Sequence, residues 1–186
     1  MPLAVPRSQL GAWAAIVLVG YAIHAAVHVA HGETWDLLWA CNVATLLLAI
    51  GSAIRQPRVV GVALCWLSFG TPLWLLDLLN GGPLTASSLL IHVGALGVAV
   101  RVARTLTVPR GTWLVALIGL AVVMALSRAL TPPAMNVNLA FGVYTGWEGV
   151  FPDERIYFAC LFAVSALGFV AVEQAMRWRA PAPDRR

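Results

Sequence analysis

Residues 112–130 read TWLVALIGLAVVMALSRAL, and this stretch decides the fold because Arg128, near its end, is its only charged residue. A helix of about 20 mostly apolar residues is long enough to cross the hydrocarbon core of a bilayer. The whole chain shares this character, since 60% of its 186 residues are hydrophobic and only 11% are charged. A water-soluble domain carries about 25% charged residues. The sequence therefore predicts an integral membrane protein.

Five further stretches have a similar length and composition, so the sequence predicts an all-α polytopic protein with six transmembrane helices in a single domain, residues 1–186. The apolar stretch near the amino terminus is too long for a signal-peptide core and is expected to be the first helix. Gly70 and Pro72 predict a kink in the third helix, because proline removes a backbone hydrogen bond. The predicted spans are 10–30, 35–54, 59–79, 84–103, 112–130 and 156–178, with a long outer loop at 131–155.

The basic residues are all arginines, and most lie in short clusters between the predicted helices. If the chain crosses the membrane six times, ten arginines fall on one side and most acidic residues fall on the other. The positive-inside rule then predicts a multi-pass protein of the plasma (inner) membrane with both termini cytoplasmic. Because the clusters flank apolar runs, membrane lipids are the expected partners and nucleic acid is not. The ten arginines are Arg7, Arg55, Arg58, Arg101, Arg104, Arg110, Arg177, Arg179, Arg185 and Arg186.

Polar side chains gather in the half of the membrane away from the cytoplasm. Counting about 1.5 Å per residue, Cys41, Asn42, His24 and His92 lie roughly 9–12 Å below the outer surface, and His28 lies about 3 Å below it. Ionisable groups inside a membrane are costly and usually face the bundle interior or a wet cavity. A shared depth therefore predicts a site, although shallow polar residues can also simply mark the headgroup boundary.

Cys41 differs from Cys65 and Cys160, which have no histidine at their predicted depth and are expected to be apolar packing residues. A thiol becomes a nucleophile when a neighbouring imidazole takes its proton. His92 is the predicted base for Cys41. Such an arrangement needs a third group to orient the imidazole. The candidates for that group are Asn138, Asn136 and Asp77.

The same histidines allow a metal or haem site. His24 and His28 are four residues apart and share one face of a helix. A third metal ligand would be His92 or Asp77, but Ala25 stands where hydrolytic zinc motifs have glutamate. Haem is possible because His24 and His92, at one depth on two helices, can ligate an iron axially.

Three segments resemble motifs of the YwaF-like integral membrane proteins, which include transmembrane protein 164. They are 38–42 (LWACN), 91–94 (IHVG) and 135–139 (MNVNL), and 66–72 (WLSFGTP) resembles the aromatic, glycine-rich third element of the family. The resemblance covers about residues 32–141.

That family is associated with lipid acyl transfer through a cysteine, so the resemblance implies that Cys41 is the nucleophile and His92 the base. The sequence departs from the family pattern at two points. Trp39 or Ala40 stands where a histidine is usual, and Asn42 stands where an acidic residue is usual.

These observations favour a membrane-embedded acyltransferase or lipid hydrolase acting on lipid esters in the outer half of the bilayer, with no cofactor or metal. Its predicted catalytic residues are Cys41, His92 and Asn138. Two alternatives stay open: a haem- or metal-binding membrane protein using His24, His28 and His92, and a small transporter or non-enzymatic membrane subunit. The residues expected to bind the substrate are His24, His28, Asn42, Asp77 and Asn136.

Overall fold

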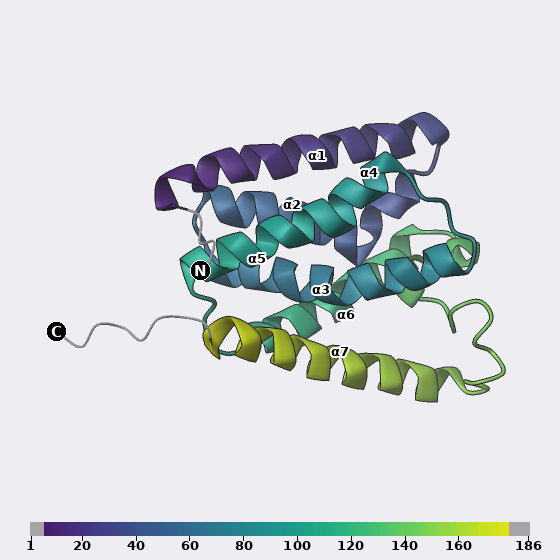
Figure 1. The fold of residues 1–186 in the computed structure, drawn as a ribbon. Helices are drawn as coiled ribbons and strands as arrows, with labels where there is room; N and C mark the ends of the chain where they lie inside the picture. The colour runs from purple at the N-terminus through teal and green to yellow at the C-terminus, as the bar shows by residue number, and fades with distance from the viewer. Residues whose placement is uncertain (1–5, 179–186) are drawn as a thin grey trace.

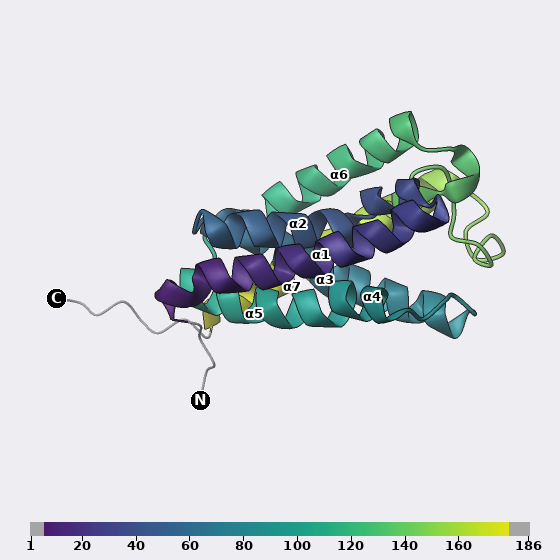
Figure 2. The same cartoon turned by 90° about the horizontal axis from the view of Figure 1, so that it is seen from above.

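A computed structural model describes residues 6–178, which form helices and turns and contain no strand. The long helices run side by side in one elongated bundle (Figures 1 and 2). A π-helical turn, Leu90–Gly94, joins α4 to α5 without a break. The helices are α1 (Leu10–His31), α2 (Ala40–Ala53), α3 (Pro57–Leu79), α4 (Ala86–Leu89), α5 (Ala95–Leu106), α6 (Thr112–Leu130) and α7 (Glu154–Trp178), with 3-10 turns at Arg7–Gln9, Thr34–Leu38, Pro133–Met135 and Val137–Leu139.

Within the described residues, five helical segments are long and apolar enough to cross a membrane, which confirms the all-helical, multi-span prediction at this level. The predicted second span, 35–54, is represented only by α2, which has 14 residues. At about 1.5 Å per residue it is some 21 Å long, less than the ~30 Å hydrocarbon core. The first residues of that predicted span fold into the 3-10 turn Thr34–Leu38 instead. The sixth crossing therefore remains a prediction.

α3 runs through the middle of the bundle and packs against α2, α5, α6 and α7 (Figures 1 and 2). Every residue from 60 to 67 is buried. Pro57 begins the helix, where its missing N–H needs no partner. Pro72 lies inside α3, which continues to Leu79, and the kink expected at Gly70–Pro72 stays a prediction.

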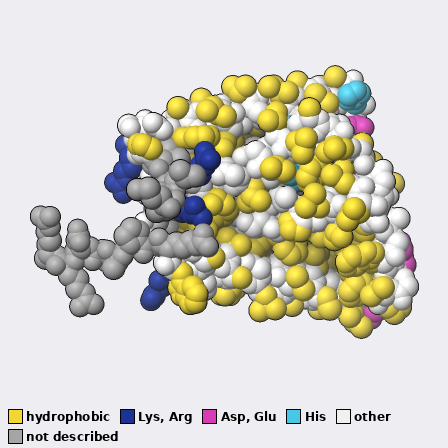
Figure 3. All heavy atoms as spheres, viewed as in Figure 1, with side chains coloured by type: hydrophobic (Ala, Val, Ile, Leu, Met, Phe, Trp, Pro, Cys, Tyr) yellow, Lys and Arg dark blue, Asp and Glu magenta, His cyan; other side chains and the backbone are white. Residues whose placement is uncertain are grey.

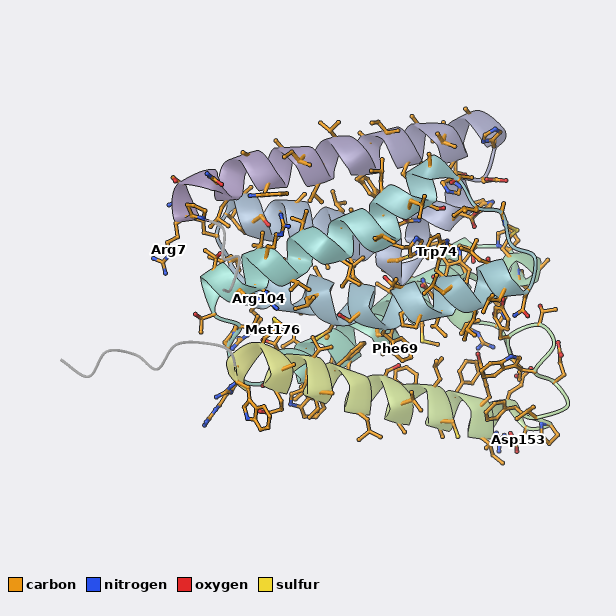
Figure 4. The ribbon with its side chains drawn as sticks, viewed as in Figure 1. Arg7, Phe69, Trp74, Arg104, Asp153 and Met176 are labelled. Atoms are coloured by element: carbon orange, nitrogen blue, oxygen red, sulfur yellow. The ribbon has the colours of Figure 1, made fainter. Side chains whose placement is uncertain are left out.

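Charged side chains mark the two ends of the bundle, and apolar side chains cover the surface between them (Figure 3). We call the end with Arg7 and Arg104 the arginine end and the end with Asp153 the acidic end (Figure 4). Large apolar side chains between the ends are exposed, among them Ile118 at 57% and Leu167 at 71%. An apolar belt of this kind suits lipid rather than water. Which end faces the cytoplasm remains a prediction.

Candidate functional site

The π-helical turn positions His92. A π-turn inserts one extra residue into a helix and is common at functional sites. Nδ1 of the buried His92 lies 2.9 Å from the carbonyl oxygen of Ser88, and because a carbonyl only accepts, Nδ1 carries the hydrogen. The His92 ring stacks on Trp74 with centroids 4.5 Å apart, and Thr71 Oγ1 donates to the His92 carbonyl at 3.2 Å. Figure 4 shows Trp74 between α3 and the α4–α5 segment. Neutral His92 thus keeps its lone pair on Nε2.

His24 on α1 is hydrogen-bonded to a serine on α4. Its Nδ1 lies 3.1 Å from Ser87 Oγ, and both residues are buried. A capping box begins α4: Thr85 Oγ1 accepts from Ser88 N at 3.1 Å, and Ser88 Oγ accepts from Thr85 N at 3.2 Å. This cap fixes the first turn of the helix and so the position of Ser87. The result is a hydroxyl and an imidazole in direct contact within the acidic half of the bundle.

Asn42 on α2 lies near His24. It is only 3% exposed, and its Nδ2 donates to the carbonyl oxygen of Asp36 at 2.7 Å. Its Oδ1 is buried without a hydrogen-bond partner of good geometry, yet the Asn42 side chain lies within hydrogen-bonding reach of His24. His92 is also close enough to His24 to interact electrostatically. We call His24, Asn42, Ser87 and His92 the buried polar layer.

The three residues predicted to be catalytic are not linked by hydrogen bonds within residues 6–178. No hydrogen bond joins Cys41 or Asn138 to His92 in the part of the chain that the structure describes. Cys41 is half-buried in the first turn of α2 and faces Gly70, where an added Cβ would lie 3.5 Å from the Cys41 Cβ. A hydrogen-bonded Cys41–His92–Asn138 triad is therefore not seen among the described residues, and the catalytic role of these residues stays a prediction.

Asn138 instead holds the outer loop onto the start of α2. Its Oδ1 accepts from Ala40 N at 2.6 Å, and its Nδ2 donates to the Leu38 carbonyl at 2.7 Å and to Ser127 Oγ at 2.8 Å. Its φ of 56° lies in the left-handed region, which asparagine tolerates better than most residues. These bonds tie the loop to the residues just before and at the start of α2 and to α6. The Asn138 side chain is therefore not hydrogen-bonded to a histidine in the described part of the chain, as the predicted orienting role would require.

We expect Asn138→Ala to lower the free energy of unfolding by about 1–3 kcal/mol, because Ala40 N and the Leu38 carbonyl lose their partner. Thermal unfolding in detergent measures the effect. Thr145→Ala, in the same loop, is the control and should change stability little. Equal midpoints for the two variants would contradict the structural role of Asn138.

Two of the predicted substrate-binding residues also serve the loop. Asp77 Oδ1 accepts from the Tyr144 hydroxyl at 2.9 Å, and burial together with this bond raises the pKa of Tyr144. Asn136 Oδ1 accepts from Phe141 N at 2.9 Å, and its Nδ2 donates to the Gly142 carbonyl at 3.2 Å. The structure brings together His24, Asn42 and His92 of the predicted residues, with His28 adjoining, and leaves Asp77 and Asn136 as loop anchors.

Of the three histidines predicted as alternative metal or haem ligands, His24 and His92 are hydrogen-bonded at one nitrogen each. Ser87 Oγ meets Nδ1 of His24 and the Ser88 carbonyl meets Nδ1 of His92, while His28 Nδ1 faces two carboxylates. Ser87 and Trp74 were not predicted as site residues. The only sequence signal for Ser87 is its place two positions after a helix-capping threonine, Thr85.

Comparisons of the chain with protein-family models, with curated proteins and with solved structures found no match.

Proposed function

We propose that this protein is a membrane-embedded hydrolase or acyltransferase that acts on lipid esters in the half of the bilayer at the acidic end. One observation carries the proposal: a buried serine hydroxyl, Ser87 Oγ, is hydrogen-bonded to a buried imidazole, His24 Nδ1, at 3.1 Å. A nucleophile within hydrogen-bonding distance of a base is the core of nucleophilic catalysis. We assign the third component, an acceptor for the other ring nitrogen, to Asn42, whose Oδ1 is buried without a hydrogen-bond partner and whose side chain lies near His24.

The proposed mechanism requires one tautomer of His24. Hydrogen on Nε2, directed to Asn42 Oδ1, leaves the lone pair of Nδ1 free to accept the proton of Ser87. Asparagine serves this orienting role in cysteine proteases, where it holds a histidine beside its nucleophile. In this arrangement Asn42 is a positioning residue rather than the substrate-binding residue expected from the sequence.

The reaction proceeds in two balanced steps. Ser87 Oγ attacks the ester carbonyl carbon as its proton moves to His24 Nδ1. The tetrahedral intermediate then collapses, the ester C–O bond breaks, and the leaving alkoxide takes the proton from His24. Water or the hydroxyl of a second lipid attacks the acyl-serine in the same way, releasing a fatty acid or a new ester. Glycerolipid esters lie just below the headgroups, near the depth predicted for this layer.

Cys41 with His92 is the second candidate pair for the same reaction, and it is the pair that the YwaF-like resemblance implies. One observation favours it: the Ser88 carbonyl holds Nδ1–H of His92 and leaves Nε2 as a base. The Cys41 thiol would have to move toward His92, because no hydrogen bond links them in the described residues.

The test is turnover of a labelled phospholipid by the purified protein in nanodiscs. Ser87→Ala and His24→Gln are expected to lower turnover at least a hundredfold, the usual size of a lost general base or nucleophile. Asn42→Ala should lower kcat with little change in KM, because it removes orientation and not binding. Ser165→Ala is the matched control, a buried serine that bonds only within α7.

Labelling with a fluorophosphonate probe identifies the nucleophile independently of turnover. Wild-type labelling that disappears in Ser87→Ala supports the serine. Turnover lost in Cys41→Ala and His92→Gln but kept in Ser87→Ala moves the nucleophile to Cys41. A folded wild type that turns over no lipid ester would remove the proposal, as would unchanged turnover in Ser87→Ala, His24→Gln, Cys41→Ala and His92→Gln.

A further inference from the structure

The end of α1 brings three potential metal ligands together. The chain leaves the helix through Gly32, whose φ of 76° places it in the left-handed region that favours glycine. Gly32 N donates to the Val29 carbonyl at 3.1 Å, and Glu33 N donates to the His28 carbonyl at 2.9 Å. This pair of bonds is the Schellman motif, which sets the residue after the glycine beside the residue five positions earlier. Here the two neighbours are Glu33 and His28.

Asp36 completes the group from the following 3-10 turn. His28 Nδ1 lies 3.2 Å from Glu33 Oε2 and 3.6 Å from Asp36 Oδ2, and the three ligand atoms are all within 4.8 Å of one another. Figure 3 shows histidine and acidic side chains adjoining at this end of α1. His28 Nδ1 is buried and has no hydrogen-bond partner, although two carboxylates face it.

The two separations from His28 Nδ1 suit ligands around a small divalent ion. Zn²⁺ bonds nitrogen and oxygen at about 2.0–2.2 Å, so neighbouring corners of its tetrahedron are about 3.3–3.6 Å apart. The two measured separations from His28 Nδ1, 3.2 and 3.6 Å, lie close to this range. Three protein ligands leave the fourth position open to water.

Neighbouring groups support Asp36 as a ligand. Its Oδ1 accepts from the Trp39 indole N–H at 3.2 Å, which turns Oδ2 toward His28. Its main-chain carbonyl accepts from Asn42 Nδ2 at 2.7 Å, which fixes the turn. Hydrogen bonds that orient the ligands are typical of metal sites and raise their affinity.

We infer that His28, Glu33 and Asp36 bind one divalent transition-metal ion of the Zn²⁺ class, which joins the end of α1 to the turn before α2. The site is separate from the proposed serine nucleophile, although the His28 ring lies edge-on to the His24 ring with centroids 4.4 Å apart. Its ligands differ from the His24, His28 and His92 set that the sequence suggested, because only His28 has carboxylates beside it.

The experiment is equilibrium dialysis of chelator-stripped full-length protein against Zn²⁺, with Mn²⁺, Ca²⁺ and Mg²⁺ in parallel. We expect one tightly bound Zn²⁺ per chain and an unfolding midpoint that rises with Zn²⁺ concentration. His28→Ala, Glu33→Gln and Asp36→Asn should each weaken binding at least tenfold. His31→Ala is the matched control, an exposed histidine in the same last turn, and should bind as wild type does.

Ser87→Ala is expected to bind Zn²⁺ with wild-type affinity. The metal site and the proposed lipid chemistry are therefore tested separately, and either can be rejected while the other stands. Folded wild-type protein that shows no saturable Zn²⁺ binding overturns the inference. The inference also fails if the His28→Ala/Asp36→Asn double variant keeps wild-type affinity. Preference for Ca²⁺ or Mg²⁺ over Zn²⁺ would reject the transition-metal class.

Discussion

Replacing Trp66 with alanine is expected to lower the free energy of unfolding by about 3–5 kcal/mol, the cost of removing a large aromatic side chain from a packed core. Trp66 on α3 is 4% exposed, and its indole N–H donates to the Ala116 carbonyl on α6 at 2.9 Å. The ring also covers Gly119, where an added Cβ would lie 2.8 Å from Trp66 Cζ2. Because the ring fills the space between the two helices, its loss leaves a cavity in the centre of the bundle.

Thermal and denaturant unfolding in detergent micelles measures this loss. Trp66→Phe keeps most of the ring but removes the hydrogen bond, so it should cost clearly less than the alanine variant. Trp147→Ala is the matched control, because Trp147 is 40% exposed in the outer loop. If Trp66→Ala and Trp147→Ala unfold at the same midpoint, the central packing of α3 on α6 is not what holds the bundle together.

Glu173→Ala is expected to lower the free energy of unfolding by about 2–4 kcal/mol, because two backbone N–H groups lose their charged acceptor. The carboxylate of this α7 residue is buried at the arginine end and accepts from two backbone groups at the start of α6: Gly111 N at 3.2 Å and Trp113 N at 3.0 Å. The first N–H groups of a helix have no partner within the helix, and a negative charge there is favourable. Gly111, at a φ of 78°, turns the chain into this helix start.

Glu173→Gln distinguishes charge from size, because the amide keeps one acceptor oxygen and loses the charge. It should lie between wild type and alanine in stability. Glu148→Ala is the control, since Glu148 is exposed and accepts only from the nearby Gly146 N at 2.8 Å. Unfolding of Glu173→Ala at the wild-type midpoint would show that the start of α6 is held by other contacts.

Part of the candidate site could be predicted from the sequence. Depth along each helix follows from counting residues, because the rise per residue is nearly constant. That count put His24, Asn42 and His92 at one level, and the structure places these three side chains close together. The count cannot give the direction in which a side chain points around its helix. Cys41 shares the same predicted level, yet among the described residues no hydrogen bond joins it to an imidazole, and its Cβ lies beside Gly70.

The contacts of Ser87 and Glu173 could not be predicted from the pattern of apolar and polar residues in the sequence. Ser87 meets His24 because a capping box fixes the first turn of α4 against α1, and the partners are 63 positions apart in the chain. Glu173 stands among the arginines at the carboxyl end of the last helix, and its role appears only when the start of α6 is packed beside it.

The π-helical turn at His92 is another feature that could not be predicted from the sequence pattern. A prediction that places side chains at 100° steps assumes an uninterrupted α-helix, and one extra residue in the turn rotates everything beyond it. In this turn the side chain of His92 stacks on Trp74 of α3, with ring centroids 4.5 Å apart.

The sequence by itself determined an all-helical protein with long apolar segments and with its charges at the segment ends. These properties follow from composition and from backbone hydrogen bonds that each helix makes within itself, so no knowledge of neighbours is needed. Tertiary structure alone decided which polar side chains meet. The rotation of each helix and its contacts with other helices depend on packing, on helix caps and on turns such as those at Gly32 and Leu90–Gly94. Packing contacts of this kind join residues that are distant in the chain.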